Sequence, residues 1–288
     1  MGRPSARIGD PKNAMTLNPD VYNGPAYVVS QERIAPNCLR MRLAAPIRGP
    51  VAAGTFAHLL CDEDATDPLL RRPFSFWDVE PQKGAWTNLD IVYTVVGKGT
   101  EILARKRPLD TVGFLGPVGC GFSQKADRNL YIFVAGGVGI VPFYHFARQI
   151  RESGTDARIL LLFGARNESM LYGIDDFPAA GVETMAATDD GSRGRKGLVT
   201  DLLLDVLKKS DPSQTMIYSC GPDRMMERVV RIARERNLPC EVSMERRMGC
   251  ALGACGACVT KVVDGDDWRY SRICWEGPAY DASRLVLD

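Results

Sequence analysis

The stretch Leu130-Tyr-Ile-Phe-Val-Ala-Gly-Gly-Val-Gly-Ile-Val-Pro142 decides the fold of the central part of this 288-residue chain. Its first six residues form a continuous apolar run, which predicts a strand buried on both faces of a sheet. The glycines that follow allow a dinucleotide phosphate to approach the N-terminus of the next helix, whose first turn accommodates Pro142. The pattern differs from the Rossmann G-x-G-x-x-G sequence, because Pro142 stands where the third glycine would fall. The stretch therefore predicts a strand–turn–helix unit that could bind a dinucleotide.

The same pattern continues downstream. Short apolar runs at residues 158–163 and 215–218 predict further buried strands. Because strands alternate with helical segments, we predict an α/β domain with a parallel sheet over residues 124–240. The helices are expected at residues 141–152, 199–209 and 223–237.

Candidate site residues stand where these strands end, which is where open α/β sheets bind ligands. Arg166 follows one apolar run, and Cys220, Gly221 and Pro222 follow another. Taken without its flanking motif, Cys220 is better explained as a buried thiol at a strand end. Asp189 ends a further strand beside the basic run RGRK at 193–196. Those cations could hold the 2′-phosphate of NADP or could belong to a solvated loop.

Residues 21–123 have the pattern of an antiparallel β-barrel. Leu39, Met41 and Leu43 alternate with arginines, and the same period of two returns at 89–96. Residues 1–20 lack the apolar core of a signal peptide, so we expect them to form a flexible extension.

Two motifs within the barrel carry the chemistry of phosphate binding. Arg72, in the sequence RRPFSF at 71–76, offers a planar cation for a pyrophosphate. Gly97 and Gly99 would let the backbone approach a phosphate, and Thr100 could cap a helix over residues 101–106. Each motif alone could equally be a surface arginine pair or an ordinary strand–turn–helix.

Four cysteines near the C-terminus have the spacing C-x4-C-x2-C-x15-C. Cys250, Cys255, Cys258 and Cys274 match the thiolate spacing of a plant-type [2Fe–2S] cluster, and small residues between them would let a loop wrap it. The alternative is a structural zinc site, although only Cys255 and Cys258 have the short spacing that zinc sites usually repeat. We predict a small cluster module over residues 241–288.

Composition excludes several classes of function. A net charge of +1 argues against nucleic-acid binding, and no apolar run approaches the length of a membrane span. His58 and His145 are the two histidines, and their apolar contexts predict structural roles. We expect a cytoplasmic protein, because nothing at the N-terminus suggests secretion.

Arg-Pro-Phe-Ser at 72–75, followed by GKGT at 97–100 and then the α/β domain, resembles the ferredoxin–NADP reductase superfamily. The sequences GGVGIVP at 136–142 and CGP at 220–222, with Met225, are also similar to motifs of that superfamily. The resemblance implies that Arg72 holds the FAD pyrophosphate, that Ser75 lies near the reactive flavin nitrogen, and that Cys220 approaches the nicotinamide. The other cofactor-binding residues that it implies are Pro73, Phe74, Tyr93, Gly97, Lys98, Gly99, Thr100, Gly136, Gly137, Gly139, Arg166, Asp189, Gly221 and Pro222.

The short C-terminal module narrows the resemblance. The segments at 245–258 and 272–280 look like those of the electron-transfer subunits of class B dihydroorotate dehydrogenase. That family implies an oxidoreductase subunit in which electrons pass among NAD(H), FAD, the cluster and the FMN of a catalytic partner, in a heterotetramer with two copies of each subunit. Members of this layout mostly use NADH. The alternative is the small subunit of a NADH-dependent ferredoxin–NADP oxidoreductase or sulfide dehydrogenase, which bifurcates electrons. Four intact cysteines favour the first family, since a carboxylate can replace one cysteine in such a relative.

Overall fold

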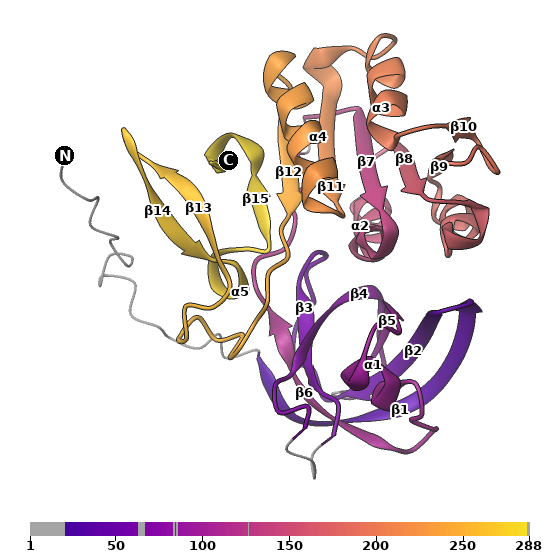
Figure 1. The fold of residues 1–288 in the computed structure, drawn as a ribbon, viewed down its shortest axis with the longest axis vertical. Coiled ribbons are helices and arrows are strands. Elements are labelled where there is room, and N and C mark those ends of the chain that lie inside the picture. Colours follow the sequence, from indigo (N-terminus) through magenta and orange to yellow (C-terminus); the bar gives the residue numbers. More distant parts are fainter. Residues whose placement is uncertain (1–20, 63–66, 83, 85, 126, 287–288) are drawn as a thin grey trace.

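Six antiparallel strands close into a barrel at the N-terminal end of the described chain (Figure 1). The structure is a computed structural model that describes residues 21–62, 67–82, 84, 86–125 and 127–286, so the expected extension at 1–20 lies outside the described residues. The strand order around the barrel is β1-β2-β5-β4-β3-β6. The strands are β1 (Tyr22–Ala35), β2 (Cys38–Ala45), β3 (Phe56–Leu60), β4 (Arg72–Pro81), β5 (Thr87–Thr94) and β6 (Thr111–Val118).

The period-two pattern forms the barrel core as predicted. Leu39, Met41 and Leu43 of β2 pack in one buried cluster with Leu89 and Ile91 of β5. The arginines between them point outward, because successive side chains of a strand alternate between its two faces. The prediction of an antiparallel barrel is confirmed.

The helix after β5 differs from the sequence prediction. Helix α1 (Lys98–Leu103) begins at Lys98, so Thr100 is its third residue and not its N-cap. The Thr100 hydroxyl accepts hydrogen bonds from the backbone N–H groups of Val96 (2.9 Å) and Gly97 (3.2 Å). Thr100 therefore caps the helix from inside its first turn. A threonine can cap from either position, so the residue type alone could not show whether Thr100 is the N-cap or the third helical residue.

The second part of the chain is an α/β layer structure, as predicted. Its seven-stranded sheet has the order β10-β9-β8-β7-β11-β12-β15, and every neighbouring pair except β12–β15 is parallel. The strands before the cysteine segment are β7 (Leu130–Gly136), β8 (Arg158–Ala165), β9 (Glu183–Thr188), β10 (Arg195–Lys196), β11 (Thr215–Cys220) and β12 (Cys240–Ser243). The helices are α2 (Val141–Glu152), α3 (Val199–Leu207) and α4 (Asp223–Glu235), with 3-10 turns η1 (Gly137–Ile140), η2 (Glu168–Met170), η3 (Ile174–Ala180) and η4 (Pro212–Gln214).

Helices cover both faces of this sheet. Helix α2 packs with Tyr131 and Phe133 of β7 in one buried cluster, whereas α3 and α4 pack with Ile132 and Val134 of the same strand in another. Helices thus cover both faces of β7, and this explains why the strand is apolar at every position.

The cysteine segment is joined to the same sheet. A hairpin of β13 (Val259–Asp264) and β14 (Asp267–Arg272) leads to α5 (Ile273–Glu276), and β15 (Ala279–Asp281) then pairs antiparallel with β12. A last 3-10 turn, η5 (Ala282–Arg284), follows. Figure 1 shows this segment beside β3 and β6 of the barrel. The domain boundaries at 123 and 240 stay a prediction.

Candidate functional site

A cleft of about 760 Å³ separates the barrel from the carboxyl edge of the sheet. Its volume lies in the range of ligand sites, and one wall comes from each part of the chain. Most of the predicted cofactor-binding residues line it: Arg72, Pro73, Phe74, Ser75, Tyr93, Gly97, Lys98, Gly99, Thr100, Gly136, Gly137, Gly139, Cys220, Gly221 and Pro222.

The barrel wall of the cleft is built from the start of β4 and the turn before α1. A Cβ atom on Gly99 would lie 3.2 Å from Sγ of Cys61 and 3.4 Å from Nε of Arg72, so the Arg72 guanidinium lies against this turn. A Cβ atom on Gly97 would meet nothing within 4 Å, so this backbone faces open space. An arginine beside an open glycine turn fits the pyrophosphate of a flavin dinucleotide.

The opposite wall is built from glycines that touch the end of β11. A Cβ atom on Gly139 would lie 2.1 Å from the carbonyl oxygen of Cys220. Gly221 has a φ of 151°, and a Cβ atom there would lie 2.9 Å from the amide nitrogen of Gly136. The turn after β7 can therefore reach the tip of β11 only without side chains, which leaves its backbone accessible to a dinucleotide.

Cys220 is the last residue of β11 and lines the nucleotide wall of the cleft. Burial raises the pKa of its thiol to about 12, so the thiol is protonated at neutral pH. A neutral thiol can contact a nicotinamide but lacks the reactivity of a thiolate.

Two predicted residues lie elsewhere along the carboxyl edge. Arg166 and Asp189 follow β8 and β9 and are not among the residues that line the cleft. Their backbones hold the two strand ends together, since the N–H of Asp189 donates to Ala165 (3.1 Å) and the N–H of Asp190 donates to Arg166 (3.3 Å).

The sequence analysis missed the part of the cleft wall that follows β12. Glu245 is the ionisable member of this group, and burial, followed by the neighbouring charge of Asp223, raises the pKa of its carboxyl group. The signal that could have found this group is its position just after a parallel strand, where ligands bind. The group consists of Ser243, which ends β12, and of Met244, Glu245 and Met248; Pro278, directly before β15, lines the cleft beside them.

Backbone N–H groups point at the sulfurs of the C-terminal cysteines. The Sγ of Cys250 accepts from Leu252 (3.3 Å) and Cys255 (3.4 Å), and the Sγ of Cys274 accepts from Gly253 (3.2 Å). A hydrogen bond from the Cys274 thiol lowers the pKa of Cys258, and the same contact raises the pKa of Cys274. The backbone N–H of Cys274 also donates to the Sγ of Cys258 (3.4 Å). Such bonds stabilise thiolates, so this donor set fits an iron–sulfur cluster.

A zinc site and a [2Fe–2S] cluster use four thiolates differently. Zinc needs four ligands around one centre, whereas the two irons of the cluster divide the thiolates between them. Across the described residues, no group of three or more His, Cys, Asp or Glu side chains that could hold a single metal ion is found.

Both histidines are buried and lie outside the cleft lining. Burial lowers the pKa of His58 to about 4, and neither of its ring nitrogens has a hydrogen-bond partner among the described residues. Burial also lowers the pKa of His145, whose Nε2 lies 2.9 Å from the carbonyl oxygen of Val51. Both are therefore neutral at pH 7.

The fold and the site define an NAD-linked iron–sulfur oxidoreductase. Residues 133–231 match the oxidoreductase NAD-binding domain. Residues 245–286 match the iron–sulfur cluster binding domain of dihydroorotate dehydrogenase B, and this match includes all four cysteines of the C-terminal motif.

Whole-chain relatives give the particular family. The electron transfer subunit of dihydroorotate dehydrogenase B (NAD⁺) from Desulforamulus reducens is 36% identical over 265 residues, covering 91% of this chain and 98% of that protein. The subunit of the same name from Bacillus caldolyticus is 37% identical over 266 residues, covering 90% and 97%. The chain belongs to the family of dihydroorotate dehydrogenase B electron transfer subunits.

Solved structures agree with the fold. A NADH-dependent reduced ferredoxin–NADP oxidoreductase, described for flavin-based electron bifurcation, has a TM-score of 0.77 and 28% identity, covering 91% of this chain and 89% of that one. The ferredoxin reductase of a carbazole 1,9a-dioxygenase, at 19% identity and a TM-score of 0.65, shares the fold over 76% of this chain and 67% of its own. The predicted cofactors, FAD, an iron–sulfur cluster and NAD(H), are confirmed at this level. Among the described residues, the structure has no helix long and apolar enough to cross a membrane.

Proposed function

We propose that this chain passes electrons between NAD(H) and an FMN-containing dihydroorotate dehydrogenase catalytic subunit, in a heterotetramer with two copies of each. The observation that carries the proposal is the continuity of the cleft with the cysteine loop. Met248 lines the cleft and packs in the same buried cluster as Cys258 and Cys274. Phe56 of the barrel lines the cleft and belongs to that cluster as well. The proposed cytoplasmic location stays a prediction.

The proposed roles of the cleft residues follow from their chemistry. Bound FAD would supply the conversion between two-electron exchange with nicotinamide and one-electron exchange with a cluster. Arg72 would neutralise its pyrophosphate, and the hydroxyl of Ser75 would hydrogen-bond near the reactive ring. The glycine turn at 136–139 and the neutral thiol of Cys220 would place the nicotinamide against that ring.

The proposed exit is the tip of the cysteine loop. Residues 254–257 are exposed, whereas Cys258 and Cys274 are buried. The side chains at this tip are a thiol, a hydrogen atom and two methyl groups, so a catalytic subunit could approach the sulfurs closely. We place the docking surface for the partner at this tip.

Reconstitution with a catalytic subunit tests the proposal. We expect the pair to reduce NAD⁺ with dihydroorotate, and each subunit alone to fail. Mass measurement of the complex should give two copies of each subunit. If the chain and its partner instead transferred electrons among NAD(H), NADP(H) and ferredoxin and supported no dihydroorotate oxidation, the bifurcating alternative would replace our proposal.

We predict a preference for NADH over NADPH. Arg193 contacts the carboxylate of Asp175 (2.6 Å), and Arg195 contacts that of Asp205, so both cations are already paired with acids. The exposed Asp189 at the end of β9 would repel a 2′-phosphate and could accept a hydrogen bond from a ribose 2′-hydroxyl. The kcat/KM for NADH should exceed that for NADPH by about tenfold or more. A higher value with NADPH would show that the basic run binds the phosphate.

A further inference from the structure

A β-bulge in β4 turns two consecutive side chains toward the nucleotide domain. Phe76 pairs with Ile91 of β5, and Asp78 pairs with Asp90, which is adjacent to Ile91. Two steps along β4 therefore match one step along β5, so Trp77 is an extra residue in the strand. Phe76 and Val79 both face the barrel core. The bulge thus leaves Trp77 and Asp78 together on the outer face, as bulges beside active sites often re-aim side chains.

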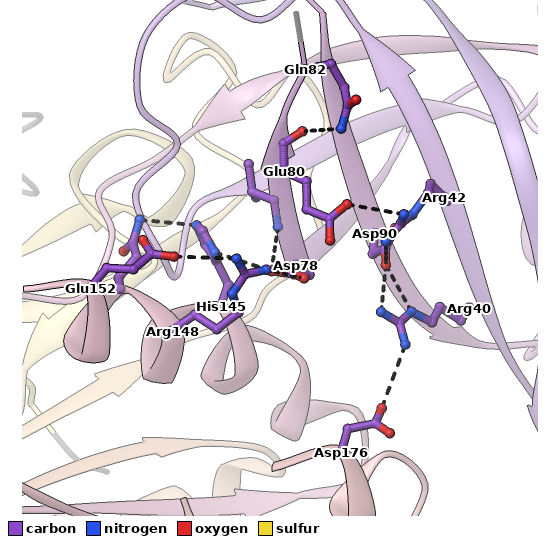
Figure 2. Close-up of polar contacts among 12 residues, drawn as sticks. Arg40, Arg42, Asp78, Glu80, Gln82, Asp90, His145, Arg148, Glu152 and Asp176 are labelled. Atoms are coloured by element: carbon purple, nitrogen blue, oxygen red, sulfur yellow. Dashed lines mark hydrogen bonds and ion pairs between the residues drawn. The ribbon is translucent and has the colours of Figure 1, made fainter. Parts of the chain in front are cut away.

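The pairing places two carboxylates opposite each other. Asp78 is 5% exposed and Asp90 is 2% exposed, and like charges on opposite strands repel. Arg40 (2.7 Å) and Arg42 (2.6 Å) of the barrel neutralise Asp90. Figure 2 shows that the cation bound to Asp78 comes instead from α2. Nη1 of Arg148 lies 2.8 and 2.6 Å from the two carboxylate oxygens of Asp78.

Further contacts hold α2 against the barrel. The ring of Tyr144 stacks on Trp77 with centroids 4.8 Å apart and planes at 5°. The side-chain amide of Gln149 accepts from the N–H of Ala53 (3.0 Å) and donates to the carbonyl of Val51 (2.9 Å). Arg40 also reaches Asp176 of η3 at 3.7 Å (Figure 2). Ion pairs, a ring stack and hydrogen bonds therefore join the outer face of the barrel to α2 and η3 of the nucleotide domain.

The positions of these residues in their elements connect them to both cleft walls. Asp78 is three residues after Ser75 on the same strand, and α2 begins directly after the turn that contains Gly139. A shift of α2 along the barrel would therefore move the nucleotide turn relative to the flavin stretch. A misplacement of about 1 Å can cost roughly 100-fold in rate.

We infer that Asp78 and Arg148 are positioning residues that set the spacing between the nicotinamide and flavin walls of the cleft. The inference rests on the proposed function but concerns a contact outside the cleft lining. It predicts that breaking the pair slows electron entry from NADH without removing either cofactor site.

The test compares Arg148→Met with the parent holoprotein. With equal FAD and iron content, the rate of flavin bleaching by saturating NADH should fall roughly 10- to 100-fold. The dissociation constant for NAD⁺, measured on the oxidised protein, should change by less than about twofold, because the nucleotide turn itself is intact. Amide hydrogen exchange should increase in residues 141–152.

Rescue and control variants separate positioning from general stability. Arg148→Lys keeps the charge. Because a single nitrogen of Arg148 contacts both oxygens of Asp78, the lysine ammonium should recover most of the rate, and this variant remains informative if Arg148→Met does not fold. Asp78→Asn combined with Arg148→Met leaves no buried carboxylate without its cation, since Glu152, the other acid that Arg148 contacts, is exposed, and it should recover part of the rate. Arg158→Met removes a pair with Glu183 (2.6 Å) that is exposed and lies within the nucleotide domain, and it should match the parent.

Different outcomes would contradict the proposed function and the positioning role of the pair. If the parent protein is not reduced by NADH, the proposed function fails. If the parent is reduced and Arg148→Met is reduced equally fast, the positioning role is wrong. The positioning role would also be wrong if Arg148→Met lowered the rate, the NAD⁺ affinity and the unfolding temperature together and neither Arg148→Lys nor the double variant restored the rate. The pair would then serve folding alone.

Discussion

The Cys255→Ser variant should lose its iron and acid-labile sulfide while it keeps FAD and the ability to pass electrons from NADH to a dye. Cys255 is exposed at the tip of the cysteine loop and does not line the cleft. A hydroxyl replaces thiolate poorly as an iron ligand, so the cluster should be lost. Electron delivery to the catalytic subunit should then be abolished. Iron, sulfide and flavin analysis of the purified protein measures this directly.

Cys120→Ser is the matched control for Cys255→Ser. Cys120 is also exposed, and its Sγ lies 3.5 Å from the carbonyl oxygen of Trp275, the residue after Cys274. It should keep full iron content because it is outside the C-x4-C-x2-C-x15-C motif. If Cys255→Ser lost FAD as readily as iron, the separation between flavin cleft and cluster loop would be wrong. Iron loss from Cys120→Ser would extend the ligand set beyond the motif.

The architecture was predictable where side-chain periodicity is simple. Alternating residues such as Met41 and Ile91 define the barrel core, and the continuous run at 130–135 defines a strand covered on both faces. Helix α2 has the predicted limits because the glycine turn ends just before it and Pro142 lies in its first turn. These signals are local, so they can be detected without knowing the tertiary structure.

Features that depend on distant contacts were not predictable. The bulge at Trp77 breaks the period of two along β4. Its outward side chains contact Tyr144 and Arg148 of α2, and those contacts exist only in the folded protein. Strand β15 has three residues and is fixed by its pairing with β12. The candidate site divides in the same way, since the glycine and cysteine motifs were predicted and the wall at 243–248 was missed. That wall has no periodic signal, because it is an irregular segment positioned by the end of β12.

The Gly139→Ala variant should distort the nucleotide site, because the added methyl group clashes with protein backbone. Its Cβ would lie 2.1 Å from the carbonyl oxygen and 2.4 Å from the carbonyl carbon of Cys220. Both are backbone atoms of a central strand, so the clash can be relieved only by moving the turn or the strand end. Overpacking of this kind costs about 1–3 kcal/mol. We expect a lower unfolding temperature and weaker NAD⁺ binding with unchanged iron content, measured by thermal unfolding and calorimetry.

Gly97→Ala makes the complementary change on the barrel wall, where the added Cβ meets no protein atom within 4 Å. Its φ of 166° is extended backbone that alanine adopts readily, so the unfolding temperature of the apoprotein should match the parent. The new methyl group would occupy cleft space instead, so flavin retention should fall while NAD⁺ affinity is kept. The two glycines are therefore distinguished by what limits them: the protein backbone at Gly139 and the cofactor at Gly97. Normal stability and NAD⁺ binding in Gly139→Ala would show that the turn can move away from β11, and that the contact does not shape the site.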